Sequence, residues 1–301
     1  MIDKVVNQSI PFAPESKILI FGGGFTGQHV AVIARKLGAN VLCSRRDIES
    51  VGADFEYDSF KKHLNPKSVL NKVTHVISCI PPLNNGKDPV LKNLKQELQE
   101  MPSLKWVGYL STTGVYGDCE GKWVTENDLP NPKQLRSIRR LSCEQEWQNS
   151  GLPMQILRLP GIYGPGRSTL DSFQSNSVKA VEKHGQVFSR IHIDDIAGAI
   201  MHLINSYTKG VSPEIINIAD NLPASNIEVL QYAATLLKID LPPIEPFEIA
   251  SKRMSPMALS FWQENRKVSN EKLCQELGYS LIHPDYKAGL KDCFSCMKIV
   301  Q

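Results

Sequence analysis

Hydrophobic runs of strand length alternate along the first two thirds of the chain with amphipathic segments of helical length. Mainly apolar runs, which predict buried strands, occupy residues 17–21, 40–43, 75–79, 106–110, 154–159 and 215–218, and residues 54–57 are a weaker strand signal. Segments with apolar positions at helical spacing lie between them, at residues 28–37, 90–99, 136–149 and 194–206. Strands that alternate with helices predict an α/β fold with a doubly wound parallel sheet.

The last third of the chain has a different pattern. Ser225 and Glu228 have the spacing of a capping box, which predicts the start of a helix that runs to Leu237. Residues 241–246 are too rich in proline for regular structure, and residues 251–269 have no clear period. A short helix is predicted at 271–277. This part of the chain therefore predicts a smaller, irregular lobe beside the sheet.

Composition excludes several classes of protein. The 301 residues are 42% hydrophobic and 22% charged, which is typical of a globular protein. The formal charge is only +3, from 34 Lys and Arg against 31 Asp and Glu, so charge indicates neither a nucleic acid nor a membrane surface as partner. No run approaches the roughly 20 apolar residues of a membrane span.

Cysteine usage and the N-terminus indicate a cytoplasmic protein. The seven cysteines are scattered, and the one close pair, Cys293 and Cys296, has no second pair to complete a zinc site. We therefore expect reduced thiols and no metal site. Residues 1–15 lack the apolar core of a signal peptide, so we expect a short leader, partly without regular structure.

The strongest chemical signal is the sequence GGGFTG at residues 22–27. Gly22, Gly24 and Gly27 have the spacing of a dinucleotide-binding loop, with a predicted strand before them and a helix after them. Phe25 and Thr26 would then lie at the helix N-terminus, where free N–H groups attract phosphates. The alternative is a glycine-rich turn that binds no ligand.

The residues after the second predicted strand distinguish NADP from NAD. An NAD site usually has Asp or Glu there, bonded to the ribose 2′-hydroxyl, whereas this chain has Ser44, Arg45 and Arg46. Two guanidinium groups and a hydroxyl suit a 2′-phosphate, so NADP is predicted and NAD is less favoured. Solvated arginines on a turn are the alternative.

Further candidates follow other strands of the sheet. Asp58 is placed either to face the adenine amine or to cap a helix. In an open α/β sheet the ligand lies outside the carboxyl ends of the strands. That rule adds to the predicted cofactor site Ile80, Pro81, Pro82, Ser111, Thr112 and Pro160.

Four motifs in a fixed order carry a resemblance to a known family. They are residues 22–27, LSTTGVYG at 110–117, RLPGIYGPG at 158–166 and RIHIDDIA at 190–197, and NIAD at 217–220 also fits. Together they resemble the extended short-chain dehydrogenase/reductase superfamily, in its NAD(P)-dependent epimerase/dehydratase group. The resemblance covers roughly residues 16–290.

The resemblance implies that different parts of the chain bind the cofactor and the substrate. Residues 16–220 would form a Rossmann domain, with 161–190 contributing to the substrate side, and residues 221–301 a small substrate-side domain. The substrate would be a small molecule bound between them, and a homodimer is left open. The resemblance also implies that Arg190 lies near the substrate. A salt bridge to a nearby aspartate is the alternative.

The catalytic residues depart from the family pattern. The family has a Ser or Thr after the fifth strand, which Thr112 matches, and a Tyr-x-x-x-Lys on the next helix. Arg136 stands where the Tyr belongs and Arg140 where the Lys belongs. Arg136 cannot exchange protons near neutral pH, whereas Arg140 could still hold a ribose or a phosphate. The chain thus resembles atypical members of the superfamily.

Other side chains are candidates for the missing proton donor or for substrate contact. By motif position, Tyr116 and Tyr163 fall near the expected crevice, together with Arg136 and Arg190. Tyr163 is the catalytic candidate, and a packed loop aromatic is its alternative. His184 and His192 are weaker candidates, as a turn residue and a structural histidine. Asp194 and Asp195 fit a helix start.

Three functions remain at this point. The chain is interpreted first as an NADP-binding oxidoreductase or epimerase/dehydratase-like enzyme with a non-standard active site. The loss of Tyr-x-x-x-Lys favours a second hypothesis, a non-catalytic NADP-binding protein that senses redox state or regulates a partner. A third, RNA binding, is weakened by the small net charge.

Overall fold

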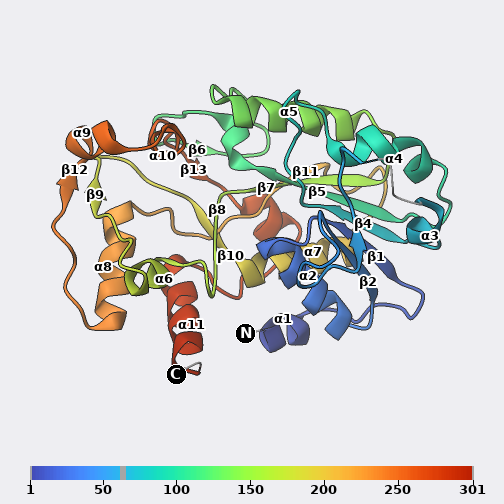
Figure 1. Cartoon of the computed structure of the whole chain (residues 1–301), viewed down its shortest axis with the longest axis horizontal. Coiled ribbons are helices and arrows are strands. Elements are labelled where there is room, and N and C mark those ends of the chain that lie inside the picture. The colour runs from blue at the N-terminus through green and yellow to red at the C-terminus, as the bar shows by residue number, and fades with distance from the viewer. Residues whose placement is uncertain (1, 62–65, 300–301) are drawn as a thin grey trace. The chain divides into compact units, whose positions relative to one another are not determined.

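The computed structural model describes residues 2–61 and 66–299 (Figure 1). Two compact units are each assembled from three segments of the chain. The first comprises Met1–Val115, Leu135–Arg158 and Ile196–Ile216, and the second comprises Tyr116–Gln134, Leu159–Asp195 and Asn217–Gln301. Neither unit is a continuous stretch, because the chain crosses between them repeatedly.

The first unit is built on a seven-stranded sheet with the strand order β11-β7-β5-β4-β1-β2-β3. The pairs β1–β2, β1–β4, β4–β5 and β2–β3 are parallel. The predicted Rossmann-like α/β fold is therefore confirmed. The strands are β1 (Lys17–Phe21), β2 (Asn40–Arg45), β3 (Phe55–Glu56), β4 (His75–Ser78), β5 (Trp106–Thr112), β7 (Met154–Leu159) and β11 (Ile215–Asn217).

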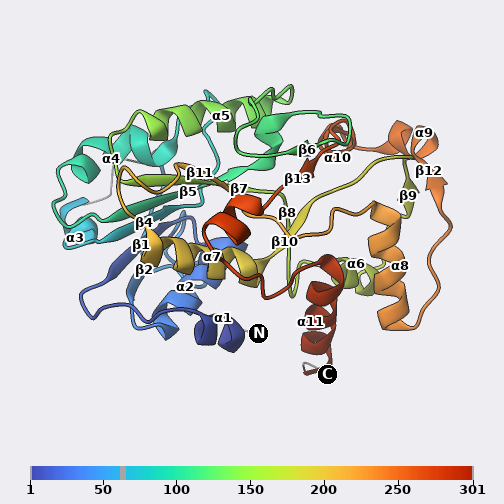
Figure 2. The same ribbon diagram turned by 180° about the vertical axis from the view of Figure 1, so that it is seen from behind.

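Helices cover both faces of this sheet. In Figures 1 and 2, α4 (Pro89–Gln99) and α5 (Leu135–Gln148) lie on one side, and α1 (Ile2–Gln8), α2 (Phe25–Lys36) and α7 (Ile193–Ser206) lie on the other. All four residues of β4 are buried, as are Ile18–Phe21 of β1. Burial on both faces explains why residues 18–21 are all apolar, and the polar end residues of β4, His75 and Ser78, are buried as well.

The position of α4 shows how local sequence fixes a helix. Asp88 caps its N-terminus, since its carboxylate accepts hydrogen bonds from the N–H groups of Val90 and Leu91, at 2.8 and 3.0 Å. Pro89 follows as the first helical residue, where its missing N–H costs nothing. Leu94 then continues the apolar face of α4 into the core against β1 and β4.

A buried ion pair joins α5 to the sheet. Arg158 in β7 donates from Nη2 to Glu144 Oε2 at 2.7 Å and from Nε to Glu144 Oε1 at 3.1 Å. The hydroxyl of Ser111 in β5 donates to the same Oε1 at 2.5 Å. Arg158 and Glu144 are only 2% and 1% exposed, so both charges have lost their hydration. Their pairing compensates for that loss.

The second unit consists of short parallel strand pairs and helices. The pairs are β8 (Gly161–Tyr163) with β10 (Arg190–His192), β9 (Val181–Glu182) with β12 (Glu245–Pro246), and β6 (Trp123–Val124) with β13 (Lys267–Val268). Its main helices are α6 (Thr169–Gln174), α8 (Asn226–Leu237) and α11 (Tyr286–Ile299), which share one core through Leu170, Val229 and Leu290 (Figure 2). The capping box of Ser225 and Glu228 at the start of α8 is confirmed.

Several elements differ from those predicted. The expected irregular leader contains α1, which forms because Val5 is buried and Lys36 of α2 pairs with Asp3 at 2.9 Å. Residues 241–246 include the short strand β12, whose Glu245 N–H donates to the Ala180 carbonyl. The short helix predicted at 271–277 is present, as the π-helix Lys272–Glu276. Further elements that the sequence did not predict are α9 (Phe247–Ala250), α10 (Pro256–Trp262) and α11.

No helix within the described residues is long and apolar enough to cross a membrane.

Replacement of Glu144 by Gln should destabilise the protein strongly. The amide still accepts hydrogen bonds, but Arg158 then keeps a buried charge without a counterion, which costs about 3–5 kcal/mol of unfolding free energy. Urea denaturation followed by circular dichroism measures the loss. Lys122→Gln is the control, because its pair with Glu120 is exposed and should contribute little. Equal effects of the two substitutions would contradict the assignment.

Candidate functional site

The loop between β1 and α2 has a shape that only glycine permits. Gly22 has a φ of +99°, which L side chains rarely adopt. A Cβ on Gly27 would lie 2.2 Å from the carbonyl oxygen of Gly22, so a side chain there would separate the helix from the strand. A Cβ on Gly24, the N-cap of α2, would meet nothing within 4 Å. The loop therefore brings the start of α2 close to β1 and leaves its N-terminus open.

Phe25 and Thr26 form the first turn of α2 and are half-buried, so both lie at this open end. Two thiol-bearing residues line the inner side of the loop. A Cβ on Gly23 would lie 3.0 Å from Cys43 Sγ, and a Cβ on Gly22 would lie 3.3 Å from Cys79 Cβ. Burial raises the pKa of Cys43 to about 11 and that of Cys79 to about 12, so both stay protonated near neutral pH.

Ser44 supports the loop from the end of β2. Its hydroxyl oxygen accepts a hydrogen bond from Gly22 N at 3.0 Å, and its carbonyl accepts one from Gly23 N at 2.7 Å. Ser44 is almost fully buried, whereas Arg45 is half-buried and Arg46 is exposed. Arg45 donates from Nε and Nη2 to the carbonyl of Val51, at 3.3 and 3.1 Å. The two guanidinium groups thus follow directly on the residue that holds the glycine loop.

Asp58 takes part in a turn after β3. Its carboxylate accepts a hydrogen bond from the N–H of Phe60 at 3.0 Å, and its carbonyl accepts one from Lys61 N. Asp58 thus accepts a backbone N–H that follows it in the chain, as a capping residue does. The adenine contact stays a prediction.

Arg140 bridges the carboxyl ends of two central strands. From α5, its Nη1 donates to the Ile80 carbonyl at 3.2 Å, to the Leu110 carbonyl at 3.2 Å and to the Tyr109 hydroxyl at 3.1 Å. Its guanidinium carbon also lies 5.5 Å from the centre of the Tyr109 ring. Pro81, which is exposed, and Pro82, which is half-buried, follow directly on Ile80. The structure thus brings Arg140 to the strand ends where the predicted cofactor residues lie.

Thr112 ends β5 at the same edge of the sheet. Its Oγ1 accepts a hydrogen bond from Gly114 N at 3.1 Å, and its side chain is half-buried. Arg136 is exposed and lies one turn before Arg140 on α5. The hydroxyl of Ser111 points instead to Glu144, as described above.

Glu144 is a residue that the sequence analysis missed. One signal pointed to it: Arg158 interrupts the apolar run MQILRL of β7. A buried arginine needs a buried carboxylate, but the sequence alone does not identify which acidic residue supplies it. Glu144 also lies on α5 four residues after Arg140, so it extends the line of residues 136 and 140 along the helix.

The remaining predicted site residues belong to the second unit. Pro160, which is half-buried, precedes β8. Tyr116 is 2% exposed, and its hydroxyl donates to Asn217 Oδ1 at 2.8 Å. The N–H of Asn217 in turn donates to Glu126 at 2.7 Å. These bonds hold Tyr116 in a fixed position inside this unit.

Tyr163 lies in the core formed by α6, α8 and α11. Its hydroxyl donates to the Asp285 carbonyl at 3.5 Å, a long and therefore weak hydrogen bond, and its ring meets His192 edge-on at 5.2 Å between centres. Burial raises the pKa of Tyr163 well above its ordinary value, so its hydroxyl stays protonated near neutral pH. The catalytic role of Tyr163 stays a prediction.

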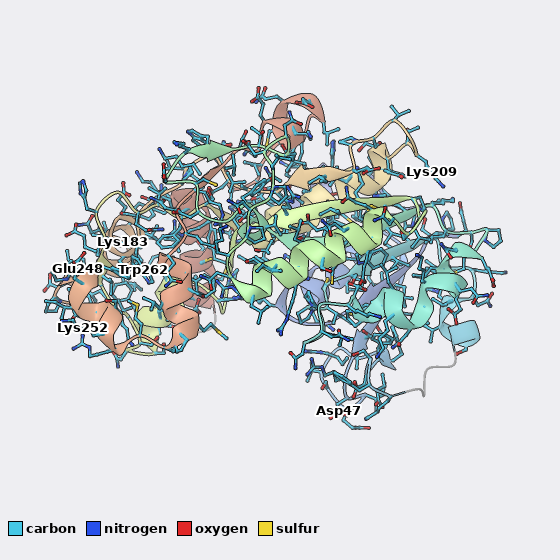
Figure 3. All side chains as sticks on the ribbon, turned by 90° about the horizontal axis from the view of Figure 1, so that it is seen from above. Asp47, Lys183, Lys209, Glu248, Lys252 and Trp262 are labelled. Atoms are coloured by element: carbon cyan, nitrogen blue, oxygen red, sulfur yellow. The ribbon has the colours of Figure 1, made fainter. Side chains whose placement is uncertain are left out.

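His184 lies on the wall of a cavity of about 280 Å³ in the second unit, lined also by Gln186, Glu228 and Trp262. Lys183 donates from its ammonium group to the Trp262 carbonyl, and it lies 5.0 Å from the centre of the Phe247 ring. Figure 3 shows Lys183 and Trp262 together at this place. The side chain at 184 is exposed, as expected for a turn residue.

Arg190 is held by backbone carbonyls. Its Nη1 donates to Phe188 O at 2.8 Å and to Ala224 O at 2.9 Å. Burial lowers the pKa of Arg190, and the nearby carboxylate of Asp220 opposes that shift. Burial also raises the pKa of Asp220 to about 8, although a hydrogen bond from Leu222 N and the charge of Arg190 favour its ionised form. Asp220 is therefore largely protonated below neutral pH.

The chain matches one family model and several solved structures. The family model of the NAD dependent epimerase/dehydratase family matches residues 92–219. A functionally unknown conserved protein from Silicibacter pomeroyi DSS is 34% identical, with a TM-score of 0.85 over 93% of this chain and 99% of that chain.

Two more distant structures are also similar. A putative NAD-dependent epimerase/dehydratase from Methylobacillus flagellatus is 26% identical, with a TM-score of 0.73 over 94% of this chain and 99% of that chain. The human epimerase family protein SDR39U1 (isoform 2), solved with NADPH, is 17% identical, with a TM-score of 0.72 over 93% and 99%. Among curated proteins, none matches this chain significantly.

Replacement of Asp220 by Asn should change how stability depends on pH. Because the folded-state pKa of about 8 exceeds the ordinary 3.8, the folded protein binds more protons than the unfolded chain between these values, and stability falls as pH rises through that window. Asn removes this loss. We expect the stability of the variant relative to wild type to grow by more than about 1 kcal/mol from pH 5 to pH 9. Denaturation at both pH values measures this stability difference. The control Asp240→Asn, at an exposed site, should show the same pH dependence of stability as wild type. A constant difference would contradict the raised pKa.

Proposed function

Because the chain belongs to the NAD-dependent epimerase/dehydratase family, we propose that it binds NADP and acts on a small organic substrate as an oxidoreductase or epimerase/dehydratase-like enzyme with a non-standard active site. The observation that carries the proposal is the glycine loop at residues 22–27, held by Ser44 and followed at once by Arg45 and Arg46.

The preference for NADP rests on the charge at the end of β2. A ribose 2′-hydroxyl needs an acceptor there, whereas a 2′-phosphate needs cationic donors. Arg45 is already oriented by its hydrogen bonds to Val51, and Arg46 is exposed beside it. A planar guanidinium donates two parallel hydrogen bonds to a phosphate, and an exposed one loses little solvation on binding. Neighbours of the same fold were solved with NADPH or with NAD, so they support a nicotinamide cofactor, and the preference for NADP rests on Arg45 and Arg46.

The residues at the open edge of the sheet have separate roles in the proposal. The bound nicotinamide would supply a hydride as NADPH or accept one as NADP⁺. The hydroxyl of Thr112 accepts a hydrogen bond from Gly114 and keeps its own O–H free to donate to a substrate oxygen. Arg140, fixed by the carbonyls of Ile80 and Leu110, would hold the ribose or a phosphate of the cofactor.

Proton transfer is the non-standard part of the proposed mechanism. Arg136 stays protonated near neutral pH and so cannot act as the family's tyrosine does. Tyr163 stays protonated as well, because burial raises its pKa. It therefore suits donation of a proton or a hydrogen bond better than removal of a proton. Tyr116 and Arg190 are proposed to contact the substrate.

A second candidate function is a non-catalytic NADP-binding regulator. The observation that favours it is the exposed arginine at position 136, where the family's proton-transferring tyrosine would stand. Nucleotide binding without turnover distinguishes this function from the first.

Arg45→Gln/Arg46→Gln should weaken NADPH binding selectively. Loss of charge-assisted hydrogen bonds to a 2′-phosphate should raise the Kd for NADPH about 10- to 100-fold, and the Kd for NADH should change little. Isothermal titration calorimetry with both nucleotides measures this. Arg253→Gln is the control, because Arg253 pairs with Glu245 in the other unit. Equal losses for NADH and NADPH would contradict the assignment of the 2′-phosphate.

Thr112→Ala should lower turnover while NADPH binding is kept. The assay follows NADPH oxidation with a panel of carbonyl compounds and nucleotide sugars. Loss of one donor to the substrate oxygen should reduce kcat about 100-fold or more, and Thr112→Ser should restore it. If the wild-type protein binds NADPH tightly and oxidises it with no member of the panel, the regulatory function is favoured instead.

A further inference from the structure

We propose that His192, Asp194, His283 and Asp292 form a binding site for a divalent transition-metal ion of the zinc class. Each of these residues places one ligand atom in a cluster whose members all lie within 4.8 Å of one another. They come from β10, the first turn of α7, the segment before α11, and α11 itself. All four belong to the second unit. Two imidazoles and two carboxylates are a ligand set that zinc, cobalt and iron accept.

The distances suit a common ion after small side-chain movements. Asp194 Oδ2 lies 3.2 Å from His283 Nε2 and 3.8 Å from His192 Nδ1. Four atoms no more than 4.8 Å apart have a point that lies within about 3 Å of all of them. Zinc requires about 2.0–2.2 Å to nitrogen and carboxylate oxygen, so each ligand atom must move by about 1 Å or less.

Burial and charge favour an ion at this place. His192 and Asp194 are fully buried, and His283 is 2% exposed. The site combines two carboxylates with two imidazoles, and the burial of a carboxylate charge is costly without compensation. A divalent cation matches this charge. Asp292 is only half-buried and gives the ion a route from solvent.

The surroundings orient the two imidazoles. His192 Nε2 lies 3.7 Å from the sulfur of Cys293. In the tautomer with the ring proton on Nε2, Nδ1 has the lone pair that binds a metal ion. Nδ1 accepts the N–H of Asp194 at 3.2 Å, a weak contact that an ion would replace. The carboxylate of Asp195 accepts hydrogen bonds from the N–H groups of Ile282 and His283, at 2.6 and 3.0 Å. Such supporting contacts fix ligands in protein metal sites.

The ligand set is closed, since four protein side chains complete a tetrahedral shell. A closed site stabilises structure and leaves no position for a reacting water. The ion would fasten α11 to β10 and to the first turn of α7 within the second unit. This role does not depend on the proposed NADP chemistry.

Cobalt and zinc binding test the proposal directly. The full chain is freed of metal with a chelator and titrated with Co²⁺, which gives a visible d–d absorption in a tetrahedral site. We expect one Co²⁺ per chain, displacement by one Zn²⁺, and a Zn²⁺-dependent rise of the thermal midpoint by several degrees.

Asp292→Asn and His283→Gln should each weaken Co²⁺ binding at least about ten-fold. His283→Gln alters a deeply buried residue and can impair folding, so the half-buried Asp292→Asn is the deciding variant. Asp240→Asn, at an exposed site, is the matched control and should bind as wild type does. The proposal is overturned if wild type takes up much less than one ion per chain. It is equally overturned if Asp292→Asn binds Co²⁺ as tightly as Asp240→Asn.

Discussion

The close approach of Gly27 to the carbonyl of Gly22 is the constraint on which the candidate cofactor site of the first unit depends. Without a side chain at 27, α2 begins close to the end of β1, and a side chain on its N-cap, Gly24, would meet nothing within 4 Å. Ser44 then fixes the turn from the neighbouring strand with two hydrogen bonds. Because β2 ends at Arg45 and Arg46 follows it, the strand that holds the glycine loop also carries the two arginines.

Most of the sheet could be predicted because its strands are buried on both faces. The boundaries of β1 and β7 match the predicted ones, since mainly apolar runs of this length fit buried strands. The glycine loop was also predictable, because its chemistry lies in six consecutive residues. In contrast, α11 was missed, since it carries lysines and cysteines among its apolar residues and its burial depends on α6 and α8.

The clusters of polar side chains could not be predicted for a different reason. Glu144 meets Arg158 and Ser111, and His192 meets His283, through contacts between residues far apart in the chain. No local pattern records such pairs, because periodicity reports which face of an element is buried and not which side chains meet there. Only an interruption of the pattern, such as Arg158 in an apolar strand, points to a partner without identifying it.

Ser44 differs from the two arginines that follow it, because its hydroxyl and its carbonyl both hold the glycine loop. Ser44 holds the glycine loop at residues 22–27 through the hydrogen bond from Gly22 N. The side chain of Arg45 bonds instead to the Val51 carbonyl, and Arg46 is exposed. Selection or design can therefore exchange the two arginines freely, but a carboxylate introduced at 44 would face the N–H of Gly22 with a larger side chain in a buried space. If Arg45 and Arg46 set the nucleotide preference as proposed, that preference can change at these two positions while Ser44 is kept.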